Sequence, residues 1–108
     1  MRIFTVDVPK KEIISVTITA STASVVLRMK GGGPVLHSNN LAAGPTGAAL
    51  FGGAAPTLHD FESIAQKDGI GFLSPSRQFN QVEYLQSGIT RLDFYAPKGP
   101  GVIEVTVI

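Results

Sequence analysis

The first 30 residues alternate between apolar and polar positions with a period of two. That period places successive side chains on opposite faces of an extended chain, so it predicts β-strands at residues 3–8, 12–20 and 23–30. The small polar residues between the second and third runs favour a turn, and we therefore expect a hairpin over residues 12–30. The apolar positions that carry the pattern are Phe4, Val6, Val8, Ile14, Val16, Ile18, Ala20, Val25, Leu27 and Met29.

The same alternation returns in the last third of the chain, where it predicts strands at residues 81–86, 89–95 and 102–108. Such strands are typical of a sheet with one face in the core and the other in water. The predicted core positions are Leu92, Phe94, Ile103, Val105 and Val107, and the predicted water-facing positions are Arg91, Asp93, Glu104 and Thr106.

One segment between these two β regions, residues 58–67, has the helical period instead. Thr57 can cap its first turn, Asp60 occupies the position of a capping-box acid, and Gly69 follows its end. The shared apolar stripe consists of Leu58, Phe61, Ile64 and Ala65. We expect this short helix to lie across an opening of the sheet.

Two further short runs, residues 35–38 and 70–73, complete a set of eight predicted strands. Many short strands with turn signals between them favour two packed sheets. The sequence therefore predicts an all-β protein: a small single-domain β-sandwich over residues 1–108, jelly-roll-like, with one short helix in a long crossover loop.

The composition is that of a folded chain without covalent cross-links. Hydrophobic residues make up 44% of the 108 residues and charged ones only 16%, the reverse of the balance that keeps a chain disordered. The chain has no Cys, which excludes disulfides and thiolate metal sites. Nine Lys and Arg against eight Asp and Glu give a net charge of +1, so we expect no nucleic-acid partner.

From the pattern of the sequence we expect neither a signal peptide nor a membrane span. Asp7 interrupts the N-terminal segment before the apolar region of a signal peptide can develop. The longest stretch without Lys, Arg, Asp or Glu, residues 31–59, holds seven Gly and three Pro, which break a helix before enough apolar residues accumulate to cross a bilayer.

The residues that usually carry chemistry form no motif here. His37 and His59 are the only histidines and neither has a second ligand at i+2 or i+4, so we expect no metal site and place both on the surface or in loops. The Ser-Pro-Ser run at 74–76 lacks the flanking glycines of a nucleophile elbow, and the glycines at 31–33 and 69–71 are read as turns, not phosphate loops. We expect no enzyme and no cofactor; catalysis would need a pocket that joins a histidine to a carboxylate.

Residues 31–59 form an unusual segment, rich in Gly, Ala and Pro and without a charged side chain. An exposed loop of a free monomer normally includes Lys, Glu or Asp, whereas small apolar residues suit the close approach of another surface. We expect a contact arm, with Leu41, Leu50 and Phe51 as the contact residues. The alternative is a long connection that folds over the sandwich's own core.

These features favour a non-catalytic structural protein that assembles with copies of itself or docks onto other proteins. A small virion component, such as a capsid, decoration or tail protein of a bacteriophage or virus, is the most natural example, and it would place the protein in a virion. Viral jelly rolls share the low charge and the Gly- and Ala-rich strands, but a shared fold is an analogy and does not determine function.

The alternative is a carbohydrate- or ligand-binding sandwich. Sugar sites combine an exposed aromatic platform with amide and carboxylate partners, and this chain has no Trp to provide the platform. The candidate contact residues for this alternative are Asn39, Asn40, Gln81, Tyr84, Asp93 and Tyr95.

The contact-arm hypothesis predicts the effect of replacing both Leu50 and Phe51 with Asp. We expect the double variant to fold but to lose assembly, because two buried large side chains each contribute on the order of 1.5–3 kcal/mol to a contact. Negative-stain microscopy of the assembled protein tests this. Particles indistinguishable from wild type would remove the segment from the contact.

Overall fold

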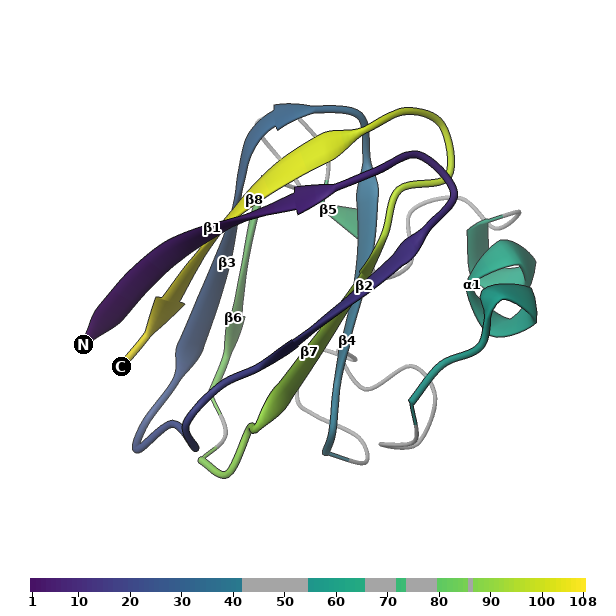
Figure 1. The fold of residues 1–108 in the computed structure, drawn as a ribbon. Helices are drawn as coiled ribbons and strands as arrows, with labels where there is room; N and C mark the ends of the chain where they lie inside the picture. Colours follow the sequence, from purple (N-terminus) through teal and green to yellow (C-terminus); the bar gives the residue numbers. More distant parts are fainter. Residues whose placement is uncertain (42–54, 66–71, 74–79, 86) are drawn as a thin grey trace.

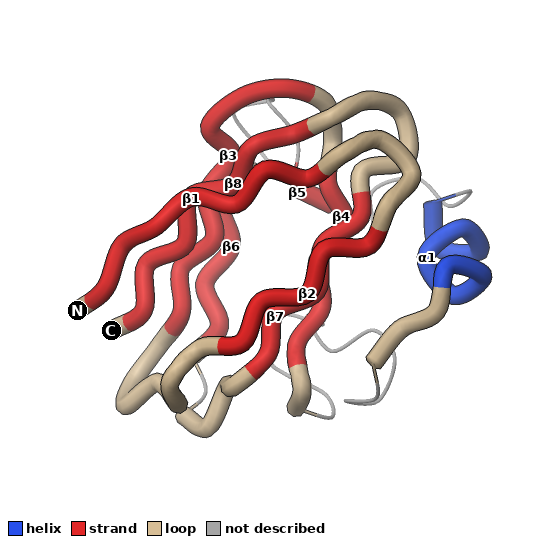
Figure 2. Tube along the Cα trace, viewed as in Figure 1, coloured by secondary structure: helices blue, strands red, loops and turns tan. Residues whose placement is uncertain are grey.

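The computed structural model describes residues 1–41, 55–65, 72–73, 80–85 and 87–108, and there the chain forms two four-stranded β-sheets packed face to face (Figure 1). In spatial order the first sheet contains β1 (Arg2–Val8), β8 (Gly101–Val107), β3 (Val25–Gly32) and β6 (Gln81–Tyr84). The second contains β2 (Ile13–Thr17), β7 (Arg91–Tyr95), β4 (Val35–Asn39) and β5 (Phe72–Leu73). The helix α1 (Leu58–Ala65) lies outside the second sheet (Figure 2).

The strand order is that of a long antiparallel hairpin rolled into two layers. The first strand pairs with the last, β2 pairs with β7, β3 with β6, and β4 with β5, and all of these pairs are antiparallel. The pairs β8–β3 and β7–β4 then close each sheet. This arrangement is the jelly-roll form of a β-sandwich, so the predicted fold is confirmed.

The hairpin predicted over residues 12–30 is wrong. β2 and β3 belong to different sheets, so the chain between them crosses from one layer to the other. Each strand finds its partner far along the chain: Ile13 pairs with Tyr95, and Val25 pairs with Val107. An alternating pattern identifies a strand but not its partner, and small turn residues serve a crossover as well as a hairpin.

The inner faces of the two sheets enclose a hydrophobic core. The core positions predicted from the alternation are confirmed, with Phe4, Ile14, Val16 and Val107 partly buried at its margin. Ala20 is an exception, since it lies beyond the end of β2 and is exposed. The predicted positions that are buried are Val6, Val8, Ile18, Val25, Leu27, Met29, Leu92, Phe94, Ile103 and Val105.

The two outer faces of the sandwich differ. On the first sheet Glu104 stays partly exposed and pairs with Lys30 at 3.5 Å, as expected for a face in contact with water. On the second sheet every residue of β4 is buried, and so are Asp93 and Tyr95 of β7. The expectation that Asp93 faces water is therefore wrong, because its carboxylate is enclosed by polar partners. Tyr95, on the same face of the sheet, is covered by α1.

Helix α1 begins where the sequence predicts. Thr57 and Asp60 form a capping box, in which Asp60 N donates to Thr57 Oγ1 at 3.2 Å and Thr57 N donates to Asp60 Oδ2 at 2.8 Å. The buried Phe61 stacks on Tyr95 with ring centroids 5.4 Å apart, and the Tyr95 hydroxyl donates to Glu62. The helix therefore covers the outer face of the second sheet, not an opening as expected.

The remaining predicted elements are present with different ends. β4 and β6 overlap the strands predicted at 35–38 and 81–86, and β5 covers the second half of the strand predicted at 70–73. The ends of three predictions, residues 66–67, 70–71 and 86, lie outside the described residues.

The end of β3 approaches the connection between β7 and β8 closely. Gly32 has a φ of +85° and pairs with Gly101, and a Cβ on Gly32 would collide with the carbonyl oxygen of Pro100. A Cβ on Gly31 would meet no atom within 4 Å. The expectation of a turn at residues 31–33 is therefore wrong for Gly31 and Gly32, which belong to β3 after a register shift in that strand.

This difference predicts opposite results for two neighbouring substitutions. We expect Gly32→Ala to destabilise the protein by about 1–3 kcal/mol, because it combines a left-handed φ with a backbone collision. Gly31→Ala is the matched control and should change stability by less than about 1 kcal/mol, since it meets open space. Urea denaturation followed by circular dichroism measures both. Equal stabilities of the two variants would contradict the close approach.

Candidate functional site

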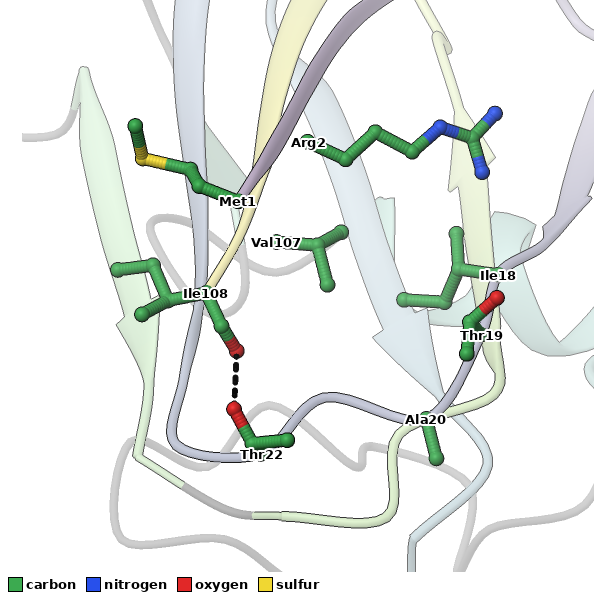
Figure 3. Close-up of a pocket in the computed structure, with 8 residues that line it drawn as sticks. All are labelled: Met1, Arg2, Ile18, Thr19, Ala20, Thr22, Val107 and Ile108. Carbon is green, nitrogen blue, oxygen red and sulfur yellow. Dashed lines mark hydrogen bonds between the residues drawn. The ribbon is translucent and has the colours of Figure 1, made fainter.

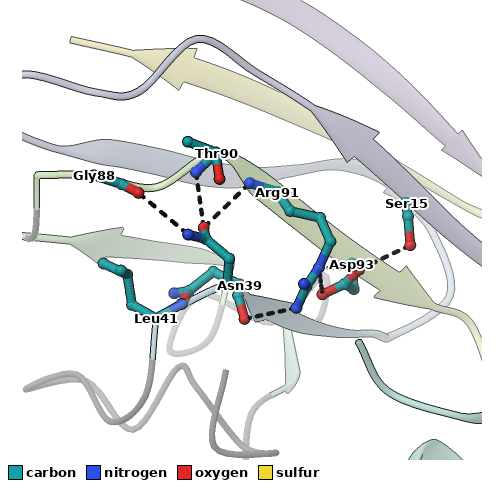
Figure 4. A network of polar contacts seen from close by, with 8 residues as sticks. Ser15, Asn39, Leu41, Gly88, Thr90, Arg91 and Asp93 are labelled. Atoms are coloured by element: carbon teal, nitrogen blue, oxygen red, sulfur yellow. Dashed lines mark hydrogen bonds and ion pairs between the residues drawn. The ribbon is translucent and has the colours of Figure 1, made fainter. Parts of the chain in front are cut away.

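Arg91 and Asp93 of β7 form an ion pair on the covered face of the second sheet (Figure 4). Arg91 Nε lies 3.0 Å from Asp93 Oδ2; the Asp93 side chain is completely buried, whereas that of Arg91 is 25% exposed. Ser15 Oγ donates to Asp93 Oδ1 at 2.8 Å, and Arg91 Nη2 donates to the carbonyl of Asn39 at 3.2 Å. The carboxylate is thus held by its own sheet, and removing one partner would leave a buried charge uncompensated.

Asn39 and Asn40 extend the same network at the end of β4. Asn40 Oδ1 accepts hydrogen bonds from the backbone N–H groups of Thr90 and Arg91 at 2.7 and 3.2 Å, and its amide nitrogen donates to the carbonyl of Gly88 at 3.2 Å. Asn39 Oδ1 accepts from the N–H of the next residue but one at 2.7 Å. The Asn40 amide therefore fastens the chain that leaves β4 to the turn that precedes β7, whereas the Asn39 side chain bonds within the segment that leaves β4.

His37 and Tyr84 form a polar pair inside the core. They come from β4 and β6, in different sheets; His37 Nδ1 and the Tyr84 hydroxyl are hydrogen-bonded, and the ring centroids are 5.6 Å apart. Burial lowers the pKa of His37 to about 4 and raises the pKa of Tyr84 well above its ordinary value, so both are neutral at pH 7. The surface or loop position expected for His37 is wrong, because this position of β4 points inward; His59 is exposed on α1.

The six sugar-contact candidates are not gathered in one place. Asn39, Asn40 and Asp93 belong to the network just described, whereas Gln81 is exposed on β6 of the other sheet. Tyr84 lies in the core. Tyr95 lies under α1, where burial and the hydrogen bond to a glutamate raise its pKa to about 12. None of the Phe and Tyr side chains whose burial the structure describes is exposed, so none of these offers a platform for a sugar ring.

The three protein-contact candidates are covered only in part by the structure. Leu41 follows β4 and packs, half-buried, against the core. Leu50 and Phe51 lie outside the described residues. Near the end of the 31–59 segment Pro56 is buried, and the chain leads from there into α1, whose Phe61 packs on Tyr95 of the second sheet.

The exposed large apolar side chains gather at one end of the first sheet. Arg2 pairs with Val107, Val107 with Val25, and Val25 with Tyr84, which defines one row across the sheet. One position further out, at the end of the sheet, the four strands are flanked by Met1, Ile108, Ser24 and Leu85, in the same order. Met1, Leu85 and Ile108 are exposed by 91%, 63% and 45%, and Ile3, two rows further in on the outer face, is exposed by 59%. We call Met1, Ile3, Leu85 and Ile108 the apolar end.

An open pocket of about 290 Å³ lies at this end (Figure 3). Met1, Arg2, Val107 and Ile108 line it together with residues of the β2–β3 connection. The Arg2 guanidinium lies 4.6 Å from the centre of the Phe4 ring, and Thr22 Oγ1 donates to the Ile108 carbonyl at 3.1 Å. The loop residues 18–24 and 87–90 carry no charge, and Arg2 is the one charged side chain among the residues that line the pocket.

The sequence held a signal for the apolar end that the search for motifs missed. Ile3 falls on the polar side of the alternation of Phe4, Val6 and Val8, and Ile108 falls on the polar side of the last strand. An apolar residue at a position that should face water is either covered by something else or exposed. In the described part of the chain both are exposed.

The comparisons with known proteins assign no family to this chain. No protein-family model matches it, and no curated protein matches it either.

Within the described ranges no three His, Asp or Glu side chains gather as a group that could hold a metal ion. No helix in those ranges is long and apolar enough to cross a membrane. The described pocket contains neither histidine.

The buried His37 predicts how stability depends on pH. An unfolded histidine takes up a proton near pH 6.5, whereas the folded protein takes it up only near pH 4, so the unfolded state binds more protons in between. Stability should therefore be complete above about pH 6.5 and fall by on the order of 3 kcal/mol as the pH drops to 4. Urea midpoints measured from pH 7 to pH 4 test this.

Two variants separate this effect from the titration of carboxylates. His37→Gln should flatten the pH dependence over this window, because it removes the buried titrating group. His59→Gln is the matched control and should keep the wild-type slope, since His59 is exposed on α1. If both variants keep the wild-type slope, the proton uptake does not belong to His37.

Proposed function

We propose that this chain is a non-catalytic structural protein that assembles with copies of itself or docks onto a larger assembly, as a small virion component of a bacteriophage or virus does. The observation that carries the proposal is the apolar end. Four of the five large hydrophobic side chains exposed in the described residues belong to it, and the fifth, Leu58, lies on α1.

The composition of this end supports a protein contact. Its large apolar side chains stand beside uncharged loops that contain mainly Ser, Thr, Ala and Gly, with the open pocket between them. Interface cores are depleted of charged residues, and each large side chain that a partner covers completely contributes on the order of 1.5–3 kcal/mol. The apolar end therefore has the properties of a surface that another protein covers.

The titratable side chains with buried partners bind one another within the protein, which supports a structural role. Asp93 is bound by Arg91 and Ser15, His37 by Tyr84, and the Tyr95 hydroxyl by a glutamate of α1. Candidate catalytic groups are recognised by an open cleft as well as by shifted pKa values. Here burial that is part of the core and of the α1 contact accounts for the shifts.

The fold adds an analogy in the same direction. Jelly rolls occur both in viral capsid proteins and in lectins. A lectin needs an exposed aromatic platform, whereas the described aromatic side chains are buried or half-buried. The virion role thus has a surface that fits it, while the sugar-binding role has none among the described residues.

Light scattering behind size exclusion tests the proposal with two matched variants. The wild-type molar mass should exceed that of a monomer and should rise with concentration. Leu85→Asp should raise the dissociation constant by roughly tenfold or more, because a charge then replaces an apolar contact. Leu58→Asp changes the same residue type on α1, outside the apolar end, and should leave assembly unchanged.

Two outcomes would contradict the proposal. If Leu85→Asp assembles as the wild type does while Leu58→Asp does not, the contact lies on α1 and not at the apolar end. A wild type that remains monomeric up to millimolar concentration would remove self-assembly, and a pull-down that found no partner protein would then remove docking as well.

A further inference from the structure

The rolled topology leaves four strands at sheet edges, and β1 is the longest of them. β1 has seven residues, whereas the edge strands β2, β6 and β5 have five, four and two. β1 lies at the margin of its sheet in both views (Figures 1 and 2). Its seven residues pair with β8 in an unbroken register. An exposed edge of this length is a template for a further strand.

The hydrogen bonds of β8 show which backbone groups of β1 face the free edge. Ile108 N donates to the carbonyl of Ser24, so the even-numbered residues of β8 bond towards β3 and the odd-numbered ones towards β1. Val105 and its neighbours two residues away therefore bond to the even-numbered residues of β1. The N–H and C=O groups of Ile3, Thr5 and Asp7 consequently point away from the sheet.

No described contact covers these three positions. Ile3, Thr5 and Asp7 are all exposed, and no backbone hydrogen bond outside the β1–β8 ladder reaches them. Natural edges are usually protected by short strands, by charges or Pro within the strand, or by a bulge. In β1 the charged residues stand only near its ends, at Arg2 and Asp7, and the four residues between them are uncharged.

We infer that β1 pairs antiparallel with β1 of a second copy of this chain, about a two-fold axis at Thr5, so that one continuous sheet runs through both copies. Thr5 is the central residue of the strand, and a two-fold axis there pairs the strand over its whole length. Because the edge-facing residues are odd-numbered in both copies, the donors and acceptors of one copy meet those of the other.

The register is compatible with the side chains. Thr5 lies opposite Thr5, Ile3 opposite Asp7 and Arg2 opposite Val8 of the second copy. No like charges are opposed, which would destabilise the pairing, and Thr–Thr pairs are favourable across antiparallel strands. Opposed residues share one face, so the two copies of Ile3 stay on the outer face of the joined sheet.

The size of this contact predicts how it behaves. A seven-residue edge buries less than the roughly 800 Å² per partner of a standard stable interface. We therefore expect a concentration-dependent dimer that further contacts, such as the apolar end, reinforce in a larger assembly. The inference deepens the proposed function and rests on its self-assembly, because it names one of the contacts between copies.

Disulfide cross-linking tests the geometry directly, since the chain has no Cys of its own. Residues opposed in a hydrogen-bonded antiparallel pair have Cα atoms about 5.5 Å apart, within the range that a disulfide spans. Thr5→Cys should form a covalent dimer on mild oxidation. The matched control is Thr17→Cys, on the free edge of β2, where the bond from Ile18 N to the Thr90 carbonyl shows that Thr17 also faces outward.

We expect Thr5→Cys to cross-link roughly tenfold or more faster than Thr17→Cys, because pairing raises the effective concentration of the two thiols. The register is tested by mixing Ile3→Cys with Asp7→Cys. The mixture should yield the heterodimer, whereas each variant alone should not, since its two thiols then lie four residues apart along the strands. Equal rates for Thr5→Cys and Thr17→Cys, or fast homodimers of Ile3→Cys, would overturn the inference.

A second pair of variants tests the same contact without a covalent bond. Proline is tolerated at an edge position whose N–H faces outward, so Thr5→Pro and Thr17→Pro should both fold. Only Thr5→Pro should raise the dissociation constant, by roughly tenfold or more, because it removes edge hydrogen bonds. If Leu85→Asp weakens assembly but the Thr5 variants do not differ from their controls, the proposed function stands and the β1 contact falls.

Discussion

The contact between the inner faces of the two sheets is the interaction on which the other features of the molecule depend. Leu27 and Ile103 of the first sheet share one completely buried cluster with Leu92 and Phe94 of the second. Burial of apolar surface contributes about 25 cal/mol per Å², so this layer is the main source of stability for a chain without disulfides. The His37–Tyr84 pair adds a polar contact between the sheets within the same layer.

The rolled hairpin then decides which surfaces remain available. It places β1 and β6 at the edges of one sheet and β2 and β5 at the edges of the other. α1 covers part of the outer face of the second sheet through Phe61, so that polar groups such as Asp93 are used within the protein. The outer face of the first sheet has no such cover from α1, and it carries both the apolar end and the free edge of β1.

This division supports the proposal of a structural role over a catalytic one. Catalysis requires titratable groups that converge in a cleft, and here the groups with shifted pKa values lie in the core, at the cap of α1 or at its contact with the sheet. What the surface offers instead is apolar area and unpaired backbone along one strand. Another protein chain can cover the apolar area and pair with the free backbone groups, whereas binding of a small polar substrate requires neither feature.

Local sequence patterns are enough to predict the strands, the helix and the layered β architecture. The period of two at Phe4, Val6 and Val8 and the capping box at Thr57 and Asp60 are local patterns, and local patterns reflect which face of an element is buried. Ile3 was readable in the same way, as an apolar residue on the polar side of its strand. Asn39, Asn40 and Asp93 were candidates for sugar contact, and their partners within the protein could not be read from their spacing.

The pairing of the strands and the roles of the polar residues depend on contacts that form only in the folded protein. Residues 13–17 and 25–32 alternate as a hairpin would, yet they belong to different sheets, because strand partners are chosen by contacts distant in sequence. His37 and Tyr84 became neutral core residues, and Asp93 became a buried ion-pair partner, because burial is set by the layer that covers a strand. A period of two indicates which face of the strand a residue points to, whereas the surrounding chain determines whether that face is in contact with water.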